Sequence, residues 1–215
     1  MTIESEGRAM TIESELKVLL KREGYERLRQ WAEGQGVALD AAVQVNHYFD
    51  TPTLGLSKAH MMFRLRERGG LWTAAFKLRV EREMPGQHSV EIEAPVEAGL
   101  ALRLCQGVGS PLDVDLAPVA RLEVEAEALG VDLAALAPIG AMTTHRIKAI
   151  SPSGAFVLEL DRSSYGGVED FELECEAADT AAAEGEVLAL LGSLGVAFEA
   201  GPPPKFARFI EALGR

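Results

Sequence analysis

Apolar and charged residues alternate along several short segments of this chain, which is the period of a half-buried β-strand. In residues 74–80 (AAFKLRV), Phe76 and Leu78 fall on one face, while Lys77 and Arg79 fall on the other. Further segments with the same period are 11–19, 42–49, 62–68, 89–94, 143–150, 155–161 and 170–176. The pattern therefore predicts about eight strands.

Apolar residues at helical spacing occur between and after these strands. We expect helices over residues 22–34, 181–194 and 205–213, the last of which follows three prolines. Pro95 and Pro118 are expected to open two more helices, because proline is favoured in the first helical turn. Amphipathic helices in a chain rich in strands predict an α+β protein in which helices cover a sheet.

The polar faces of the predicted strands consist almost entirely of charged residues. The acidic pairs, two residues apart, are Glu13/Glu15, Glu91/Glu93, Glu159/Asp161 and Glu172/Glu174. The basic pairs are Arg64/Arg66, Lys77/Arg79 and Arg146/Lys148. Hard divalent cations take carboxylate oxygens as ligands, and phosphates take Arg and Lys. The two kinds of pair together suit a complex of a metal ion with a polyphosphate.

Periodicity alone leaves open which face of each strand points inward. Charges that face solvent and apolar residues that face a core are the ordinary arrangement. A closed barrel of about eight strands offers an alternative, because its interior can hold side chains or one small ligand. In that case the charged faces would line the interior, and the helices would cover the apolar outside.

Composition and charge narrow the classes of function. A formal net charge of −12 over 215 residues argues against non-specific binding to nucleic acid or to an anionic membrane. No apolar run reaches the roughly 18 residues of a membrane helix, and the N-terminus lacks the apolar core of a signal peptide, so we expect a cytoplasmic protein. Cys105 and Cys175 make neither a disulfide framework nor a zinc site. No Walker A, G-x-G-x-x-G or G-x-S-x-G motif occurs.

The charged motifs, taken in order, resemble those of the CYTH family, also called triphosphate tunnel metalloenzymes. The run Glu13-Ser14-Glu15-Leu16-Lys17 matches the family's Glu-x-Glu-x-Lys signature on its first strand. The segments that follow in family order are NHYFDTPTLGLSKAHMMFRLRER (46–68), FKLR (76–79), SVEIEA (89–94), HRIKA (145–149), LELD (158–161), FELECE (171–176) and PPPKFARFIEAL (202–213). The resemblance thus extends from about residue 11 to residue 213.

This resemblance implies an eight-stranded antiparallel closed β-barrel, with a charged lumen that forms a triphosphate tunnel and with amphipathic helices packed outside. It also implies Mg²⁺ or Mn²⁺ and a small-molecule triphosphate, most simply inorganic triphosphate, which is hydrolysed to phosphate and pyrophosphate. Thiamine triphosphatase, class IV-like adenylyl cyclase and a non-catalytic polyphosphate- or nucleotide-binding module remain alternatives, as does a barrel for an apolar ligand. A homodimer would fit the family.

The resemblance assigns roles to individual charged residues. The implied metal ligands are Glu13, Glu15, Glu159, Asp161, Glu172 and Glu174, with Glu91 and Glu93 as supporting tunnel carboxylates. The implied phosphate ligands are Lys17, Arg64, Arg66, Lys77, Arg146, Lys148 and Lys205. Lys205 has an independent argument, because a lysine at the start of a helix makes an anion site. Glu13, Glu15 and Lys148 are the candidate catalytic residues, Lys148 by assisting proton transfer.

The sequence MTIESE occurs twice, at residues 1–6 and 10–15. The second copy continues as a strand through Lys17, whereas the first continues into Gly7, which weakens β pairing. We therefore expect the second copy to act in the site. Residues 1–9 would then form a flexible preface to a single CYTH domain over residues 10–215.

Overall fold

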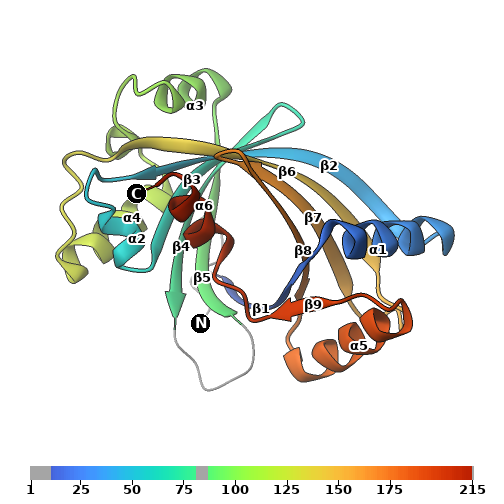
Figure 1. The fold of residues 1–215 in the computed structure, drawn as a ribbon. Helices are drawn as coiled ribbons and strands as arrows, with labels where there is room; N and C mark the ends of the chain where they lie inside the picture. The colour runs from blue at the N-terminus through green and yellow to red at the C-terminus, as the bar shows by residue number, and fades with distance from the viewer. Residues whose placement is uncertain (1–10, 81–86, 215) are drawn as a thin grey trace, which may run out of the picture. The chain divides into compact units, whose positions relative to one another are not determined.

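The computed structural model describes residues 11–80 and 87–214, with side chains from residues 15 and 88 onward in the two stretches (Figure 1). Within these residues the chain forms nine strands and six α-helices. It divides into two compact units. The first consists mainly of Asn46–Val80 and Ser89–Ala141, and the second mainly of Glu13–Val45 and Met142–Arg215. Strands β2 (Ala38–Asp50) and β6 (Ala137–Ile150) contribute residues to both.

The first unit is built on an antiparallel hairpin of two strands whose alternate residues are apolar. Its elements are α2 (Gly55–Lys58), β3 (Met61–Arg68), β4 (Leu71–Val80), β5 (Gln87–Val96), α3 (Ala98–Cys105), the 3₁₀ turn η1 (Pro111–Asp113) and α4 (Ala117–Leu129). Phe63 of β3 lies opposite Phe76 of β4, and both are buried. Leu104 of α3 and Leu122 of α4 belong to the same core, so these helices cover the apolar face of the hairpin.

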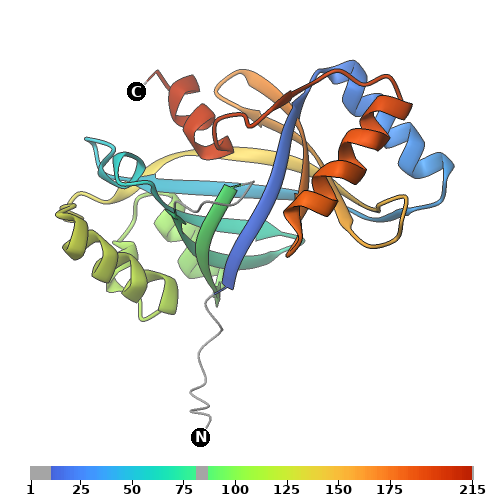
Figure 2. The ribbon, with the colours of Figure 1, turned by 90° about the horizontal axis from the view of Figure 1, so that it is seen from below.

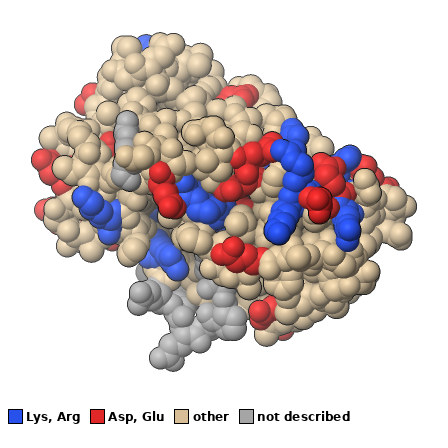
Figure 3. All heavy atoms as spheres, viewed as in Figure 1, with Lys and Arg blue, Asp and Glu red and all other residues tan. Residues whose placement is uncertain are grey.

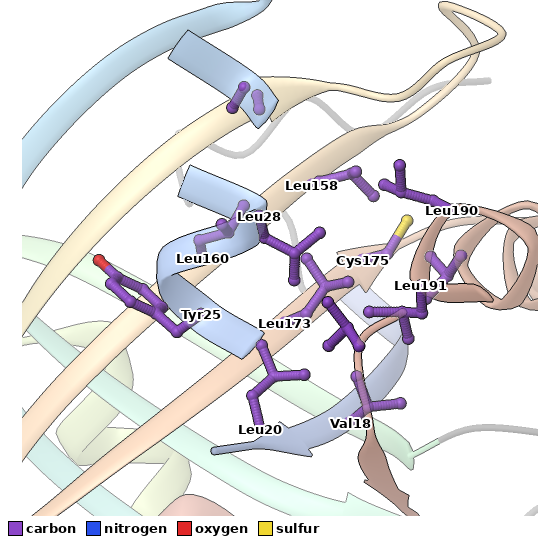
Figure 4. Close-up of a cluster of buried hydrophobic side chains, with 14 of the residues drawn as sticks. Val18, Leu20, Tyr25, Leu28, Leu158, Leu160, Leu173, Cys175, Leu190 and Leu191 are labelled. Carbon is purple, nitrogen blue, oxygen red and sulfur yellow. The ribbon is translucent and has the colours of Figure 1, made fainter. Parts of the chain in front are cut away.

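The second unit is an antiparallel sheet in the order β6-β7-β8-β1-β9. Its remaining elements are β1 (Thr11–Leu20), α1 (Arg22–Gly34), β7 (Val157–Tyr165), β8 (Val168–Glu176), α5 (Thr180–Ser193), β9 (Phe198–Ala200) and α6 (Lys205–Ala212). Helices α1 and α5 lie against this sheet (Figures 1 and 2). Leu28 of α1 and Leu191 of α5 pack with Leu160 and Leu173 from the strands (Figure 4). The apolar face of the sheet is therefore covered by helices.

The α+β fold with an antiparallel sheet is confirmed, and each of the eight predicted strands is present. The ninth, β9, has three residues, all of them exposed. Pro118 lies in the first turn of α4 as predicted, but the prediction for Pro95 is wrong, because Pro95 lies in β5. Helix α3 begins instead after Glu97, whose side chain caps it by accepting hydrogen bonds from the N–H groups of Gly99 and Leu100. No helix in the described part of the chain is long and apolar enough to cross a membrane.

Asp50 organises the turn between β2 and β3, where the sequence has Asp-Thr-Pro. Its side chain is 1% exposed. Oδ1 accepts hydrogen bonds from the backbone N–H of Thr51 at 2.7 Å and of Leu56 at 2.9 Å, and Oδ2 accepts one from Ser57 at 3.0 Å. Leu56 and Ser57 lie in the first turn of α2, whose N–H groups have no partner within the helix. Asp50 thus holds the segment that leads into β3.

Replacing Asp50 by alanine is expected to lower the free energy of unfolding by about 3 kcal/mol, because buried N–H groups lose a charged acceptor. Equilibrium unfolding in urea measures this change. The Asp50→Asn variant keeps one acceptor oxygen, so its loss should be smaller. Equal losses in the two variants, or none in Asp50→Ala, would show that this carboxylate does not hold the turn.

Candidate functional site

Four carboxylates gather on one face of the hairpin formed by β7 and β8. The antiparallel register places Asp161 opposite Glu172, and Glu159 opposite Glu174. Asp161 and Glu172 are fully buried, and the other two are 7% and 5% exposed. The apolar residues of the same strands are buried on the opposite face, against α1 and α5. The charged face of these strands therefore does not face solvent, which was one of the two arrangements that the sequence left open.

The neighbouring elements bring basic side chains to these carboxylates. Lys17 of β1 lies opposite Glu174 in the strand register, and its Nζ is 2.9 Å from Glu174 Oε1. Arg146 of β6 lies opposite Asp161. Lys205 is the first residue of α6, as its sequence position predicted. Three cations from three elements thus meet the acidic face of the hairpin.

Arg146 makes the most extensive contacts in this cluster. It donates from Nε to Asp161 Oδ1 at 2.7 Å, and from one terminal nitrogen to Asp161 Oδ2 at 2.6 Å and to Glu174 Oε2 at 2.7 Å. Its other terminal nitrogen pairs with Glu159. One guanidinium therefore links three carboxylates of the hairpin, two of them on β7.

The carboxyl groups of Asp161 and Glu174 remain ionised in this setting. Burial favours their protonated forms, but the neighbouring cations outweigh burial. Lys205 and Arg146 hold the pKa of Asp161 below its usual value, and Lys17, Lys205 and Arg146 hold the pKa of Glu174 well below its usual value. These two carboxylates are therefore negatively charged near neutral pH.

The lysines likewise remain charged. Burial disfavours the ammonium form of Lys17, but Glu174, Glu15 and Glu172 raise its pKa above the usual value. For Lys205, burial also acts to lower the pKa, but the surrounding carboxylates raise it well above the usual value. An ammonium in such a site is a permanent positive charge and can bind an anion.

Asp161, Glu172 and Glu174 fit a divalent cation. Among the described residues, these three offer one oxygen each within 4.8 Å of one another. Mg²⁺ and Mn²⁺ favour oxygen ligands of this kind. Both oxygens of Glu172 are buried and make no hydrogen bond, although Arg208 and Lys205 lie 2.9 and 2.8 Å from them. A metal ion at Glu172 would therefore compete with these two neighbouring cations and not with a hydrogen bond.

Three other predicted residues, Glu159, Lys148 and Glu15, lie at the border of this cluster. Glu159 lies outside the group of three and pairs with Arg146 and with Lys148 Nζ at 2.6 Å. The Lys148 side chain is 36% exposed. Glu15 Oε2 lies 3.5 Å from Lys17 Nζ. The side chain of Glu13 lies outside the described part of the structure, so its role stays a prediction.

The first unit holds a second charged cluster, on β3, β4 and β5. Arg64 donates to Glu91 Oε1 at 2.8 Å, and Lys77 lies 3.2 Å from Glu91 Oε2. Glu93 lies 3.7 Å from Arg64. Arg66 donates from Nε to the side-chain oxygen of Asn46 at 2.9 Å. Glu91 thus contacts two of the predicted phosphate ligands, and the roles assigned to these three residues stay predictions.

Arg208 and Asp170 belong to the second unit's cluster, and sequence reasoning missed both. Arg208 donates from Nε to Asp170 Oδ2 at 2.8 Å and lies 2.9 Å from Glu172 Oε1. Tyr165 donates its hydroxyl hydrogen bond to the same Asp170 oxygen. Two spacings could have found them: Arg208 lies three residues after Lys205 on one helix face, and Asp170 lies two before Glu172 on one strand face.

Basic and acidic side chains also lie next to one another on the face shown in Figure 3.

The sequence profile of the CYTH domain matches residues 11–197. The chain belongs to the CYTH family. A protein of Bacillus subtilis named "Putative triphosphatase YjbK" is 27% identical over 168 residues, which cover 78% of each chain.

Solved structures show the same fold in other CYTH-like proteins. A crystal structure of a "putative adenylate cyclase" from Bacillus halodurans is 26% identical, with a TM-score of 0.73, and the match covers 94% of this chain and 99% of that one. HpAC1 from Hippeastrum, described as a "putative adenylyl cyclase" with a dominant triphosphatase activity, is 22% identical, with a TM-score of 0.78 and coverage of 93% and 95%. Closure of the CYTH sheet into a barrel in this chain stays a prediction from the sequence.

Proposed function

We propose that this chain is a divalent-metal-dependent hydrolase of triphosphate-bearing substrates and that inorganic triphosphate is its simplest substrate. One observation carries the proposal: Lys17, Arg146 and Lys205 interleave with Asp161, Glu172 and Glu174 in one buried cluster. A set of this kind offers ligands for phosphate oxygens and for a hard cation at the same place. The relative named as a triphosphatase, matched over 78% of both chains, supports the same reaction.

In the proposed reaction, water attacks a terminal phosphorus and pyrophosphate leaves. Lys17, Arg146 and Lys205 bind phosphate oxygens and stabilise the charge on the transferred group. Asp161, Glu172 and Glu174 would hold Mg²⁺ or Mn²⁺, with Glu13, Glu15 and Glu159 as further candidates. The bound ion supplies Lewis-acid stabilisation of phosphate charge. Lys148, paired with Glu159, is the candidate for proton transfer.

Arg64, Arg66 and Lys77 are proposed as further phosphate ligands, supported by their family positions and by the contacts of Arg64 and Lys77 with Glu91. A cytoplasmic location and a homodimer stay predictions from the sequence.

Adenylyl cyclase is the second candidate function, because the Bacillus halodurans protein carries that name.

A substrate panel tests the function. The purified full chain should release phosphate from inorganic triphosphate with Mg²⁺ or Mn²⁺ and lose this activity in excess EDTA; thiamine triphosphate, ATP and GTP complete the panel. An Asp161→Asn protein prepared identically is the control for contaminating phosphatases and should show the blank rate. Formation of cyclic AMP from ATP without phosphate release would favour the cyclase. Tight triphosphate binding without turnover under any metal would favour a binding module.

A further inference from the structure

The ammonium group of Lys205 is in contact with all three carboxylates that could hold a metal. Its Nζ lies 2.5 Å from Asp161 Oδ2, 2.8 Å from Glu172 Oε2 and 3.1 Å from Glu174 Oε1. These three residues are the group whose oxygens lie within 4.8 Å of one another. The lysine therefore already uses the oxygens that a divalent cation would need.

Lys17 and Arg146 reach this group less completely. Lys17 Nζ is close to Glu174 but 4.0 Å from Glu172. Arg146 contacts Asp161 and Glu174. Lys205 differs from both in that its ammonium contacts one oxygen of each of the three acids. It is the cation in the described cluster whose position conflicts most directly with a metal ion.

The backbone at Lys205 is anchored independently of its ammonium group. Arg208, one turn further along α6, donates to Asp170 at 2.8 Å and to the carbonyl oxygen of Pro203. Phe209 of α6 is fully buried and contacts the ring of Tyr165. A lysine ammonium sits on a flexible four-carbon stem. The ammonium can therefore leave the three carboxylates without displacement of the helix.

We propose that Lys205 is a specificity-determining residue: it competes with a free divalent cation for Asp161, Glu172 and Glu174, so that the site admits the cation together with a triphosphate. Two cations at one set of carboxylates repel each other strongly in a buried site. Phosphate oxygens offer the ammonium an alternative charged partner. A bound triphosphate draws the ammonium away and frees the three carboxylates for the metal, while a bound metal displaces the ammonium and frees it for phosphate. Metal and triphosphate then strengthen each other's binding. This inference rests on the proposed function for the identity of the anion.

The first test measures binding of Mn²⁺ alone, from the electron paramagnetic resonance signal of free Mn²⁺, with no phosphate compound present. The Lys205→Met variant should bind Mn²⁺ about ten-fold more tightly than the wild type, within the usual range of coupling between sites. Lys205→Arg keeps the positive charge and Lys58→Met removes one from an exposed position, so both should match the wild type. Equal or weaker Mn²⁺ binding by Lys205→Met overturns the proposal.

The second test adds the imido analogue of triphosphate, which resists hydrolysis. The wild type should then bind Mn²⁺ more tightly than it does alone, and this gain should be smaller in Lys205→Met. Should Lys205→Met fail to fold, an unchanged Mn²⁺ affinity of the wild type with the analogue still overturns the proposal. Failure of the proposed function is a separate result: no triphosphate is hydrolysed, while the Mn²⁺ measurement still reports on Lys205.

Discussion

Replacing Arg146 by methionine is expected to lower kcat/KM for triphosphate by about a thousand-fold or more, the scale on which an arginine stabilises transferred phosphoryl charge. The same change is expected to lower the free energy of unfolding by about 3 kcal/mol, because it removes the cation that links three buried carboxylates and leaves them with fewer positive partners. Arg146 contacts Asp161, which is fully buried, and Glu174, which is 5% exposed, so water cannot replace the guanidinium. Methionine fills part of the volume and removes the charge.

Phosphate release at several triphosphate concentrations and unfolding in urea measure the two effects of Arg146→Met. Arg162→Met is the matched control, since Arg162 lies on the adjacent strand with its side chain 37% exposed and 4.0 Å from Glu169. An exposed pair of this kind contributes little, so the control should stay within about 0.5 kcal/mol of the wild type and keep its activity. Retention of more than a tenth of wild-type kcat/KM by Arg146→Met would contradict the assigned role.

The strands could be predicted because their two faces differ in chemistry. Asp161 and Glu172 alternate with Leu160 and Leu173, and this period of two places the charges on one face whichever way that face points. The direction of that face could not be predicted from periodicity, since it depends on which surface the helices cover. In the structure α1 and α5 cover the apolar face, which leaves the charged face buried on the other side.

Short elements escaped prediction for a different reason. Strand β9 has three residues and α2 has four, too few for a period to be recognised. Pro95 shows the limit of a local signal: proline favours the first turn of a helix, but the end of a strand accepts it as well. The capping carboxylate of Glu97, two residues later, decides where α3 begins.

The candidate site was predicted by residue type, and its pairings were not. The sequence singled out Lys17, Glu174 and Lys205, but their mutual contacts depend on strand register and on the path of the chain into α6. Arg208 was missed because its role depends on Asp170 and Glu172, which are distant in the sequence. The charged motifs therefore indicate the chemistry of the site, but they do not indicate which of its residues contact one another.

Replacing Lys17 by methionine is expected to lower triphosphate hydrolysis by about a hundred-fold or more, a loss typical of removing one group that stabilises transition-state charge. Lys17 is 8% exposed, and its ammonium lies 2.9 Å from Glu174, beside the group of three carboxylates. The first copy of the repeat offers a matched control, because Arg8 stands two residues after Glu6 as Lys17 stands two after Glu15.

Arg8→Met should therefore hydrolyse triphosphate at the wild-type rate, as should a chain that lacks residues 1–9. Phosphate release by the three proteins, with circular dichroism to verify folding, makes the comparison. A folded Lys17→Met protein with full activity would remove the second copy of the repeat from the site. A large loss in Arg8→Met would instead assign a function to the first copy. Gly7 in that copy disfavours a strand of the kind that positions Lys17 in the second copy. Lys17, which follows the glutamates of the second copy, thus distinguishes the two copies of the motif. The rate of phosphate release measures this difference.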